Sequence, residues 1–277
     1  MTIRITNRRM LAIMTVPLFL IIPWVWAEAS EAAFTELYYY EVDRHDRYTN
    51  FIEQNPGINT EDAVWMVNSE LDMPFYGKTV EIEDLSAFPL LVNKYNRLPQ
   101  TYEPPELVPL ESGRLMAPNA RDAFERMRAD AEKEGYKIRD VSAYRSHAYQ
   151  SSLYNRYLLR GSQLSVDSYS ARAGHSEHQT GMAVDLAGLN GAMNRFGETR
   201  ESVWVNENAY RYGFIVRYPP GMQKITGYIY EPWHITYVGE TVSSEMREFG
   251  IITLEEYKVK HIDHSPGAPE LYVPRKK

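Results

Sequence analysis

No cysteine occurs anywhere in the 277-residue sequence. The fold therefore cannot be held by disulfide bonds, and a thiolate metal site, a cysteine nucleophile and a lipid-modified cysteine anchor are excluded as well. Any metal ion must be bound by histidine, aspartate or glutamate. The chain is long enough to bury one sizeable hydrophobic core or two small ones, and a hydrophobic content of 44% is ordinary for a globular protein.

The charge balance excludes one large class of partners. The sequence has 30 basic and 37 acidic residues, which gives a formal net charge of −7. Proteins that bind nucleic acid need an excess of positive charge to neutralise phosphates. We therefore expect no nucleic-acid partner.

The N-terminal residues 1–30 have the pattern of an export segment. Three arginines precede the 17-residue apolar run Met10–Trp26. A positive flank stays in the cytoplasm, so the chain that follows should lie outside the membrane. The run is at the short end of the roughly 17–25 residues that span a bilayer. It is therefore either a membrane anchor or a signal peptide cleaved after Ala27 or Ala29, and we expect an extracytoplasmic protein that is anchored or secreted.

The rest of the chain divides into three parts. Residues 31–110 form an N-terminal extension and spacer, of which 31 to about 50 is polar and tyrosine-rich. A short helix follows, for which Asn59 can serve as the N-cap. Residues 111–265 form the main domain. Residues 266–277 are a proline-rich, basic tail, which we expect to be loose.

The main domain combines helices and strands without regular alternation. Apolar residues from Ala120 to Ala131 repeat at helical spacing after Pro118, and Gly135 can end that helix. Further helices are predicted over 148–159 and 203–212. Strands are predicted over 137–144, 182–186, 214–217, 228–230 and 233–238. This order favours an α+β fold rather than a parallel wound sheet.

Two short segments carry residues suited to metal chemistry. In the first, His178 lies in a polar loop and Asp185 lies seven residues later in an otherwise apolar strand. A carboxylate in a buried strand is unfavourable unless it is paired or metal-bound. The second is Glu-Pro-Trp-His at residues 231–234, where Pro232 interrupts the strand, so that Glu231 and His234 can face one cavity. Taken singly, such residues are more often core or capping residues than metal ligands.

The motifs taken together resemble a known family. They are Ser-x-His-x-x-Gly-x-Ala-x-Asp at 176–185, Glu-Pro-Trp-His at 231–234, Ser-Ala-Tyr-Arg-Ser at 142–146 with Gln150 behind it, and the stretch 204–218. In this order they resemble the VanY-type zinc D-alanyl-D-alanine carboxypeptidases, whose relatives include LdcB-type L,D-carboxypeptidases and VanX-type dipeptidases. The resemblance runs from about Leu91 to Val238. It implies a small central antiparallel sheet flanked by helices, as in Hedgehog and D,D-peptidase domains, and makes 111–265 the zinc carboxypeptidase domain.

The resemblance implies one Zn²⁺ per chain, with His178, Asp185 and His234 as its ligands. Two neutral imidazoles and one carboxylate leave the ion a net charge of about +1 and an open fourth position, as in catalytic zinc sites. Such an ion lowers the pKa of bound water from about 15.7 toward about 7.

Four further positions take roles from the same resemblance. Glu231 matches the catalytic base, and Arg145 matches the arginine that polarises the scissile carbonyl. Ser176 and Gln150 match positions near the substrate. Thr236 departs from the family pattern, in which an arginine is common, and this puts in doubt any contact made by that arginine.

The sequence thus predicts an enzyme that removes the C-terminal D-Ala from peptidoglycan stem peptides. An L,D-carboxypeptidase acting on tetrapeptide stems remains open, because the subgroups share the catalytic residues. A non-catalytic, zinc-stabilised wall-binding module is a rival, and so is an endopeptidase acting on cross-bridges. The presence of Glu231 and Arg145 favours catalysis, because a purely structural site needs neither.

Overall fold

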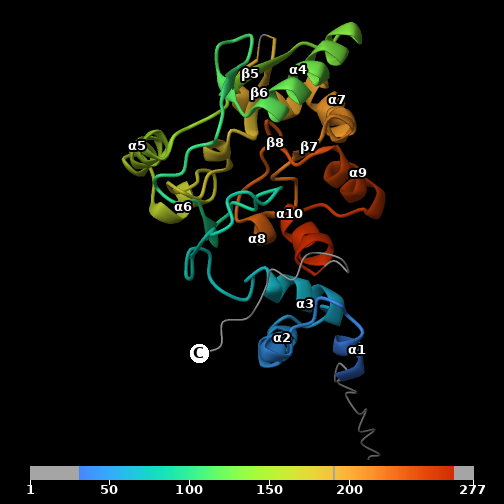
Figure 1. Ribbon diagram of the computed structural model, residues 1–277. Coiled ribbons are helices and arrows are strands. Elements are labelled where there is room, and N and C mark those ends of the chain that lie inside the picture. Colours follow the sequence, from blue (N-terminus) through green and yellow to red (C-terminus); the bar gives the residue numbers. More distant parts are fainter. Residues whose placement is uncertain (1–30, 190, 265–277) are drawn as a thin grey trace, which may run out of the picture.

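The computed structural model describes residues 31–189 and 191–264. The predicted export segment and the predicted tail from residue 266 lie outside these residues. Within the described part of the chain, no helix combines the length and the apolar character needed to cross a membrane. The molecule is elongated in Figure 1, with the N-terminal helices α1 to α3 at one end and a larger part that holds the remaining labelled helices and strands above them.

The centre of the larger part is a four-stranded antiparallel sheet. Its strands are β5 (Ile138–Ser142), β6 (Ala183–Gly188), β8 (His234–Tyr237) and β7 (Phe214–Val216), in that spatial order. All six residues of β6 are buried because it lies inside the sheet with layers on both faces. The α+β architecture with a small antiparallel sheet, predicted from the sequence, is confirmed.

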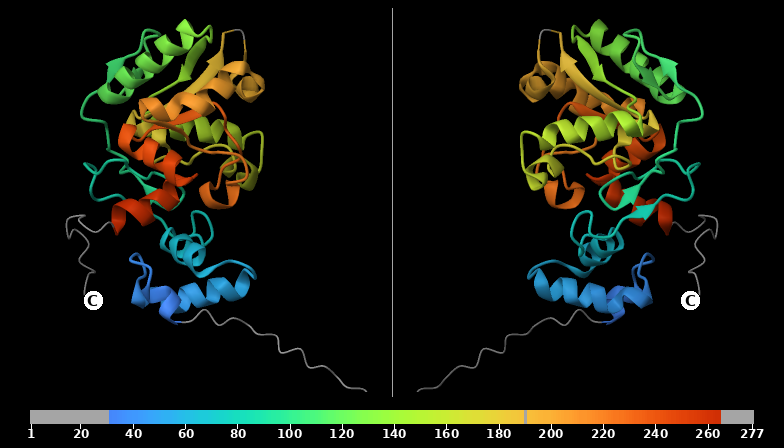
Figure 2. Two further views of the ribbon diagram at one scale, coloured as in Figure 1. Left: turned by 90° about the vertical axis from the view of Figure 1, so that its right-hand side faces the viewer. Right: turned by 90° about the vertical axis from the view of Figure 1, so that its left-hand side faces the viewer.

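Helices pack around this sheet and form one large core. In α4 (Pro118–Lys133), proline occupies the first turn, and Phe124 and Met127 are fully buried. This helix packs with α7 (Arg200–Asn208) and the strands around Leu186. The remaining helices of this part are α5 (His147–Leu158), α6 (Gln163–Asp167), α8 (Gln223–Thr226), α9 (Glu240–Phe249) and α10 (Leu254–Tyr257). In Figure 2, α4 lies near the top of both views, and α7 is nearer the viewer on the left whereas α5 is nearer on the right, so α7 and α5 lie on opposite sides of the sheet.

The N-terminal extension packs around a second, small core, to which Val259 near the C-terminal end of the described chain also contributes. Its helices are α1 (Glu31–Thr35), α2 (His45–Gln54) and α3 (Thr60–Asn68). The side chain of Asn59 accepts from the backbone N–H of Asp62, so this residue caps α3 as predicted. The stretch from residue 31 to about 50, which we interpret as a spacer, contains two helices whose Phe34 and Tyr48 are fully buried.

Short strand pairs connect the two parts. The first is the parallel pair β1 (Val80–Glu81) and β2 (Asn96–Arg97), and the second is the antiparallel pair β3 (Val108–Pro109) and β4 (Leu115–Met116). No strand forms over 228–230, so that prediction was wrong. The backbone N–H of Ile229 instead donates to the carbonyl of Ser168 over 2.9 Å, in a loop contact.

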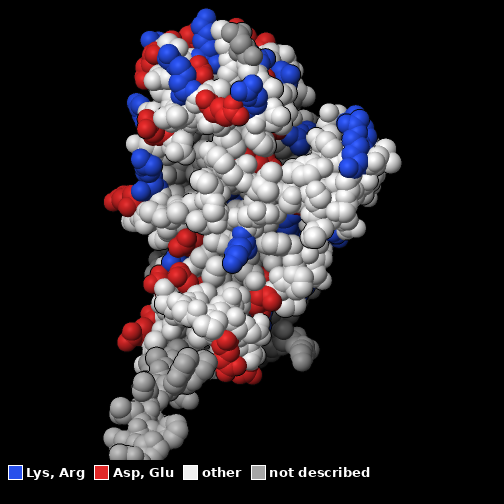
Figure 3. All heavy atoms as spheres, turned by 180° about the vertical axis from the view of Figure 1, so that it is seen from behind, with Lys and Arg blue, Asp and Glu red and all other residues white. Residues whose placement is uncertain are grey.

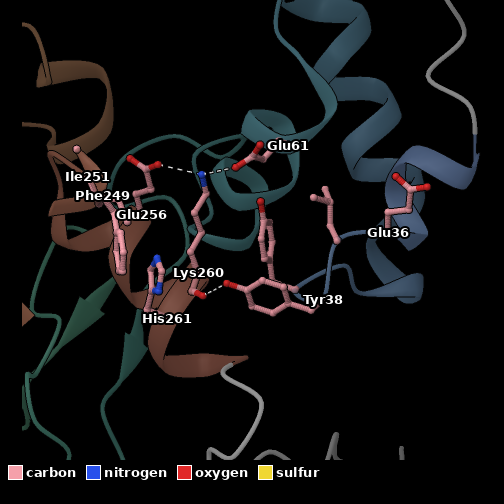
Figure 4. A pocket seen from close by; sticks show the side chains of 11 residues that line it. Glu36, Tyr38, Glu61, Phe249, Ile251, Glu256, Lys260 and His261 are labelled. Carbon is pink, nitrogen blue, oxygen red and sulfur yellow. Dashed lines mark hydrogen bonds and ion pairs between the residues drawn. The ribbon is translucent and has the colours of Figure 1, made fainter. Parts of the chain in front are cut away.

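The N-terminal helices are fixed to the C-terminal ones through Lys260. This residue lies on a π-helical turn (Lys258–Asp263) after α10, and its Nζ donates to Glu61 of α3 over 2.7 Å and to Glu256 of α10 over 3.0 Å. Tyr38 donates its hydroxyl proton to the carbonyl of Lys260. The residues that make these contacts line a pocket between the N-terminal and C-terminal helices, which is shown in Figure 4.

Charge is unevenly spread over the face seen from behind. Figure 3 shows acidic and basic side chains interspersed over the end that carries α4 and α7. The lobe that carries α5 is largely uncharged on the same face, and its exposed side chains include Tyr149, Leu159 and Leu164.

Candidate active site

Three side chains suited to metal binding meet at the centre of the sheet. Asp185 of β6 is paired directly with His234 of β8, and His178 comes from the 3₁₀ helix η2 (Glu177–Thr180) just before β6. Nε2 of His178 lies 3.3 Å from Oδ2 of Asp185, and Nδ1 of His234 lies 3.0 Å from Oδ1 of the same carboxylate. One ligand atom of each residue lies within 4.8 Å of the others, and all three residues are buried. The structure thus brings together the three residues predicted to bind the metal.

Each histidine is held so that one ring nitrogen faces the cluster. Nδ1 of His178 lies 2.6 Å from the carbonyl of Ala143, to which it donates its proton, and this leaves Nε2 unprotonated on the side of the cluster. His234 points Nε2 toward Oε2 of Glu177 at 3.3 Å, so that Nδ1 faces the cluster. Acceptors of this kind fix the tautomer and the orientation of metal-binding histidines. The pKa of His178 is lowered to about 4, and burial is the largest cause of this shift. The ring is therefore neutral at pH 7, as a metal ligand must be.

Behind His234 lies a buried network of charged residues. Arg217 donates from Nε to Glu177 over 2.6 Å and from its two terminal nitrogens to Glu255 over 3.0 and 2.7 Å. The hydroxyl of Thr236 donates to Oε2 of Glu177 over 2.5 Å. Burial alone would raise the pKa of Glu177, but the charge of Arg217 and the bonds from His234 and Thr236 lower it to about 2. Glu177 is therefore ionised and can hold the His234 ring in place.

The sequence analysis missed this network. Arg217 directly follows the apolar strand β7, and Glu177 precedes a predicted metal ligand. A charged residue beside a buried strand is the signal that identified Asp185, and the same signal could have identified Arg217. Thr236 makes a bond to Glu177 at the position where the family pattern has an arginine.

Arg145 reaches the cluster from the loop after β5. Its Nε donates to the hydroxyl of Ser142 over 2.8 Å, and Nη1 donates to Oε1 of Gln150 over 3.2 Å. Nη2 donates to the carboxylate of Asp185 and lies 2.9 Å from Nε2 of His178. Both ends of the Gln150 amide are hydrogen-bonded, so this residue positions Arg145.

Glu231 lies in the turn before β8. Its N–H donates to the carbonyl of Tyr218 over 3.0 Å, and its carbonyl accepts from the N–H of His234 over 3.1 Å. The turn contains Pro232, as expected from the sequence. The carboxyl is buried and close enough to the charges of His234 and Asp185 to interact with them, and burial, the largest effect, raises the pKa of Glu231 to about 7. A carboxyl with a pKa near neutrality can both accept and return a proton.

The donor set fits zinc. Two imidazole nitrogens and one carboxylate oxygen are common Zn²⁺ ligands, and three protein ligands are typical of a catalytic site in which water or substrate takes the fourth position. Ser176, the remaining predicted substrate residue, lies just before η2 and is buried.

Comparison with known proteins places the chain in a family. Residues 113–240 match the family model described as VanY: D-alanyl-D-alanine carboxypeptidase. The chain is also 40% identical over 187 residues to YodJ of Bacillus subtilis strain 168, in an alignment that covers 62% of this chain and 68% of YodJ. The chain belongs to the VanY family of carboxypeptidases. As a VanY-family protein it is a peptidase, and its predicted metal ligands, Glu231 and Arg145 all lie inside the matched range.

Two solved structures resemble this VanY-family chain. The first is the LdcB LD-carboxypeptidase, with 36% identity and a TM-score of 0.62, covering 66% of this chain and 90% of LdcB. The second is a mutant of the D,D-pentapeptidase VanY from the VanB-type resistance cassette, in complex with Zn(II). It has 32% identity and a TM-score of 0.54, and the match covers 61% of this chain and 97% of that structure. A Zn(II) complex in this relative agrees with the cluster of His178, Asp185 and His234.

Proposed function

We propose that this protein is a zinc-dependent D-alanyl-D-alanine carboxypeptidase that removes the terminal D-Ala from peptidoglycan stem peptides. The observation that carries the proposal is the position of Glu231, which is buried and whose backbone carbonyl accepts the N–H of His234 over 3.1 Å. A metal site that served only the fold would have no use for a proton acceptor at this place. The family of the chain and the Zn(II) complex of its VanY relative support the same function.

The residues divide the chemical work between them. Zinc bound by His178, Asp185 and His234 would lower the pKa of water from about 15.7 toward about 7. Glu231 accepts the proton of the attacking water and returns it to the leaving amine. Arg145 donates to the carbonyl oxygen as negative charge develops there; loss of one such donor typically costs about 10²–10³ in rate.

Supporting residues keep these groups in place. Gln150 holds Arg145 through its amide oxygen, and Glu177 holds the ring of His234. Ser176 stands at the start of η2 beside the ligand His178, where we propose that it contacts the substrate. A donor held in place before the reaction stabilises the transition state without reorganising first.

Glu231→Gln tests the catalytic assignment. The variant should bind one equivalent of zinc but lose nearly all hydrolysis of a pentapeptide stem, because an amide cannot accept the proton. Exposed Glu248, changed to Gln in the same way, is the matched control and should keep full activity. Unchanged turnover of Glu231→Gln would remove this residue from the mechanism.

His234→Ala tests the metal assignment. The variant should contain less than one equivalent of zinc after dialysis, measured by atomic emission, because it loses one of three protein ligands. Full zinc occupancy would show that His234 is not a ligand.

An L,D-carboxypeptidase activity is the second candidate, favoured by the similarity to LdcB. Incubation with pentapeptide and tetrapeptide stems, followed by mass spectrometry, separates the two. Loss of D-Ala from the pentapeptide alone supports the D,D activity, and loss from the tetrapeptide alone supports the L,D activity. Hydrolysis of neither would favour the non-catalytic wall-binding module.

We also propose that the protein acts outside the cytoplasmic membrane, where peptidoglycan lies. The arginines and the apolar run Met10–Trp26 support this location. A reporter enzyme active only outside the membrane, fused after the chain, should be active in cells. An inactive reporter would refute the export of the chain.

A further inference from the structure

The segment 75–98, which precedes the family match, packs against the loop that leads into the active site. The N–H of Leu98 donates to the carbonyl of Gly174 over 2.8 Å. Nδ1 of His175 lies 2.7 Å from the carbonyl of Asn93, to which it donates its proton. The loop held in this way continues directly into η2 and the ligand His178. In Figure 1 this segment runs beside α6 and α8.

Lys94 is the charged centre of this contact. It is 2% exposed, and its Nζ lies 3.9 Å from the ring centroid of Tyr228 and 4.7 Å from that of Tyr76. The ammonium also donates to the carbonyl of Asp167 at the end of α6. A desolvated cation over an aromatic face is attracted by the negative charge of that face. Gly227 makes room for it, since a Cβ at this position would lie 2.1 Å from Cε of Lys94.

From Lys94, a series of tilted ring contacts leads to the metal cluster. The ring of Tyr228 packs on that of Tyr218 with centroids 4.6 Å apart, and Tyr218 packs on the ligand His234 at 4.9 Å. The carbonyl of Tyr218 also accepts the N–H of Glu231. Tyr218 therefore contacts the proposed ligand His234 with its ring and the proposed base Glu231 with its backbone. The neighbouring ring of Tyr228 contacts Lys94.

Tyr76 closes the same contact from the other side. Its hydroxyl lies 3.4 Å from that of Tyr228, and its ring lies edge-on to His175 at 5.0 Å. The guanidinium of Arg172 lies 3.9 Å from its centroid. Tyr76 has a positive φ of 62°, a conformation rare for tyrosine that persists only where its surroundings enforce it.

We propose that Lys94 is a positioning residue of the active site, which fixes His234 and Glu231 through the rings of Tyr228 and Tyr218. The inference rests on the proposed zinc carboxypeptidase function. Lys94 is buried and lies behind Tyr228, so it acts on catalysis through its neighbours. Its loss should therefore change metal binding and kcat and leave KM unaltered.

The test is Lys94→Met, which keeps the length of the side chain and removes its charge. Outer-shell partners of metal ligands typically contribute 10–100-fold to metal affinity or activity. Lys94 reaches His234 only through two rings, so we expect zinc affinity, measured by competition with a chelator, and kcat to fall by up to about tenfold, the lower limit for a direct partner, with KM unchanged. Exposed Lys224→Met is the matched control and should change neither quantity.

A second pair of variants distinguishes an effect of the ring contacts on the active site from a general loss of stability. Tyr228→Phe keeps the ring and should keep zinc affinity and kcat, whereas Tyr228→Leu removes the ring and should lower both. The inference is overturned if Lys94→Met and Tyr228→Leu lower only the melting temperature, with zinc affinity equal to that of Lys224→Met. Zinc affinity is measured without substrate, so this arm decides the inference even if the wild type hydrolyses no stem peptide and the proposed function fails.

Discussion

Arg217→Met should destabilise the protein strongly at neutral pH and much less at acid pH. The guanidinium is buried and carries hydrogen bonds to both Glu177 and Glu255. Methionine keeps much of the side-chain volume but removes the charge. The variant therefore leaves two buried carboxylates without their cation.

The magnitude follows from the contacts that remain. Removing one partner of a buried ion pair costs about 3–5 kcal/mol. Thr236 and His234 still contact Glu177 in the variant, so we expect a loss near the lower limit, about 3 kcal/mol. With a urea dependence of about 1–3 kcal/mol/M, the unfolding midpoint should fall by about 1–3 M.

The pH dependence gives the prediction its sign. The pKa of Glu177 is lowered from 4.5 to about 2 in the native protein. Its interactions therefore stabilise the fold above pH 4.5, and this stabilisation is lost as the pH falls toward 2. In the variant, the buried carboxyl of Glu177 has lost the cation beside it and therefore favours its protonated form. The difference in unfolding free energy between wild type and variant should therefore be largest at pH 7 and should shrink below pH 4.5.

Urea unfolding followed by tryptophan fluorescence, with chelator in every sample, measures this difference. Exposed Arg160→Met removes an arginine without a buried partner and should change stability by less than about 0.5 kcal/mol. A loss below about 1 kcal/mol for Arg217→Met, or an equal loss at pH 7 and pH 4, would refute the assignment of a buried ion network.

Two further predictions concern other parts of the fold. Gly227→Ala should destabilise the protein more than Gly221→Ala. Both glycines have a positive φ, but only at Gly227 would the added Cβ lie against Lys94. Equal urea midpoints of the two variants would contradict this contact. The pKa of His264 is raised above 6.5 by its hydrogen bond to Glu41, so this pair stabilises the fold below pH 6.5 and the effect is lost as the pH rises through the raised pKa. The unfolding free energies of wild type and His264→Gln should thus differ at pH 6 and converge as the pH rises through the raised pKa. The difference should be less than about 1 kcal/mol because the pair is partly exposed.

Local rules explain the elements that the sequence predicted well. Asn59 caps α3 with its side chain, and Gly213 ends the helical segment before β7 with a φ of 83°. Such signals act within one turn of the chain, so they can be recognised without knowing the fold. Asp185 could be singled out for a similar reason, because a carboxylate in an apolar strand needs a partner wherever that partner comes from.

The errors arose where distant residues decide the structure. The segment 228–230 has the composition of a strand, but the structure pairs it with no strand and packs Tyr228 between Lys94 and Tyr218. A strand needs a neighbour with free backbone groups, and the local sequence does not say whether one is available. In the same way, distant residues decide that Phe34, Tyr39 and Tyr48 are buried, since they pack against α3 and Val259.

The sequence by itself singled out the side chains that we propose bind a metal ion and move a proton, because His178, Asp185, Glu231 and His234 stand in short motifs whose combined order resembles that of a known family. Only the tertiary structure decided what holds them in place. Arg217 pairs with Glu177 behind His234 and also with Glu255, and Lys94 anchors the rings beside His234. The physical reason is that a buried charge is stable only beside its partner, and these partners are brought together from distant parts of the chain by the packing of the whole domain.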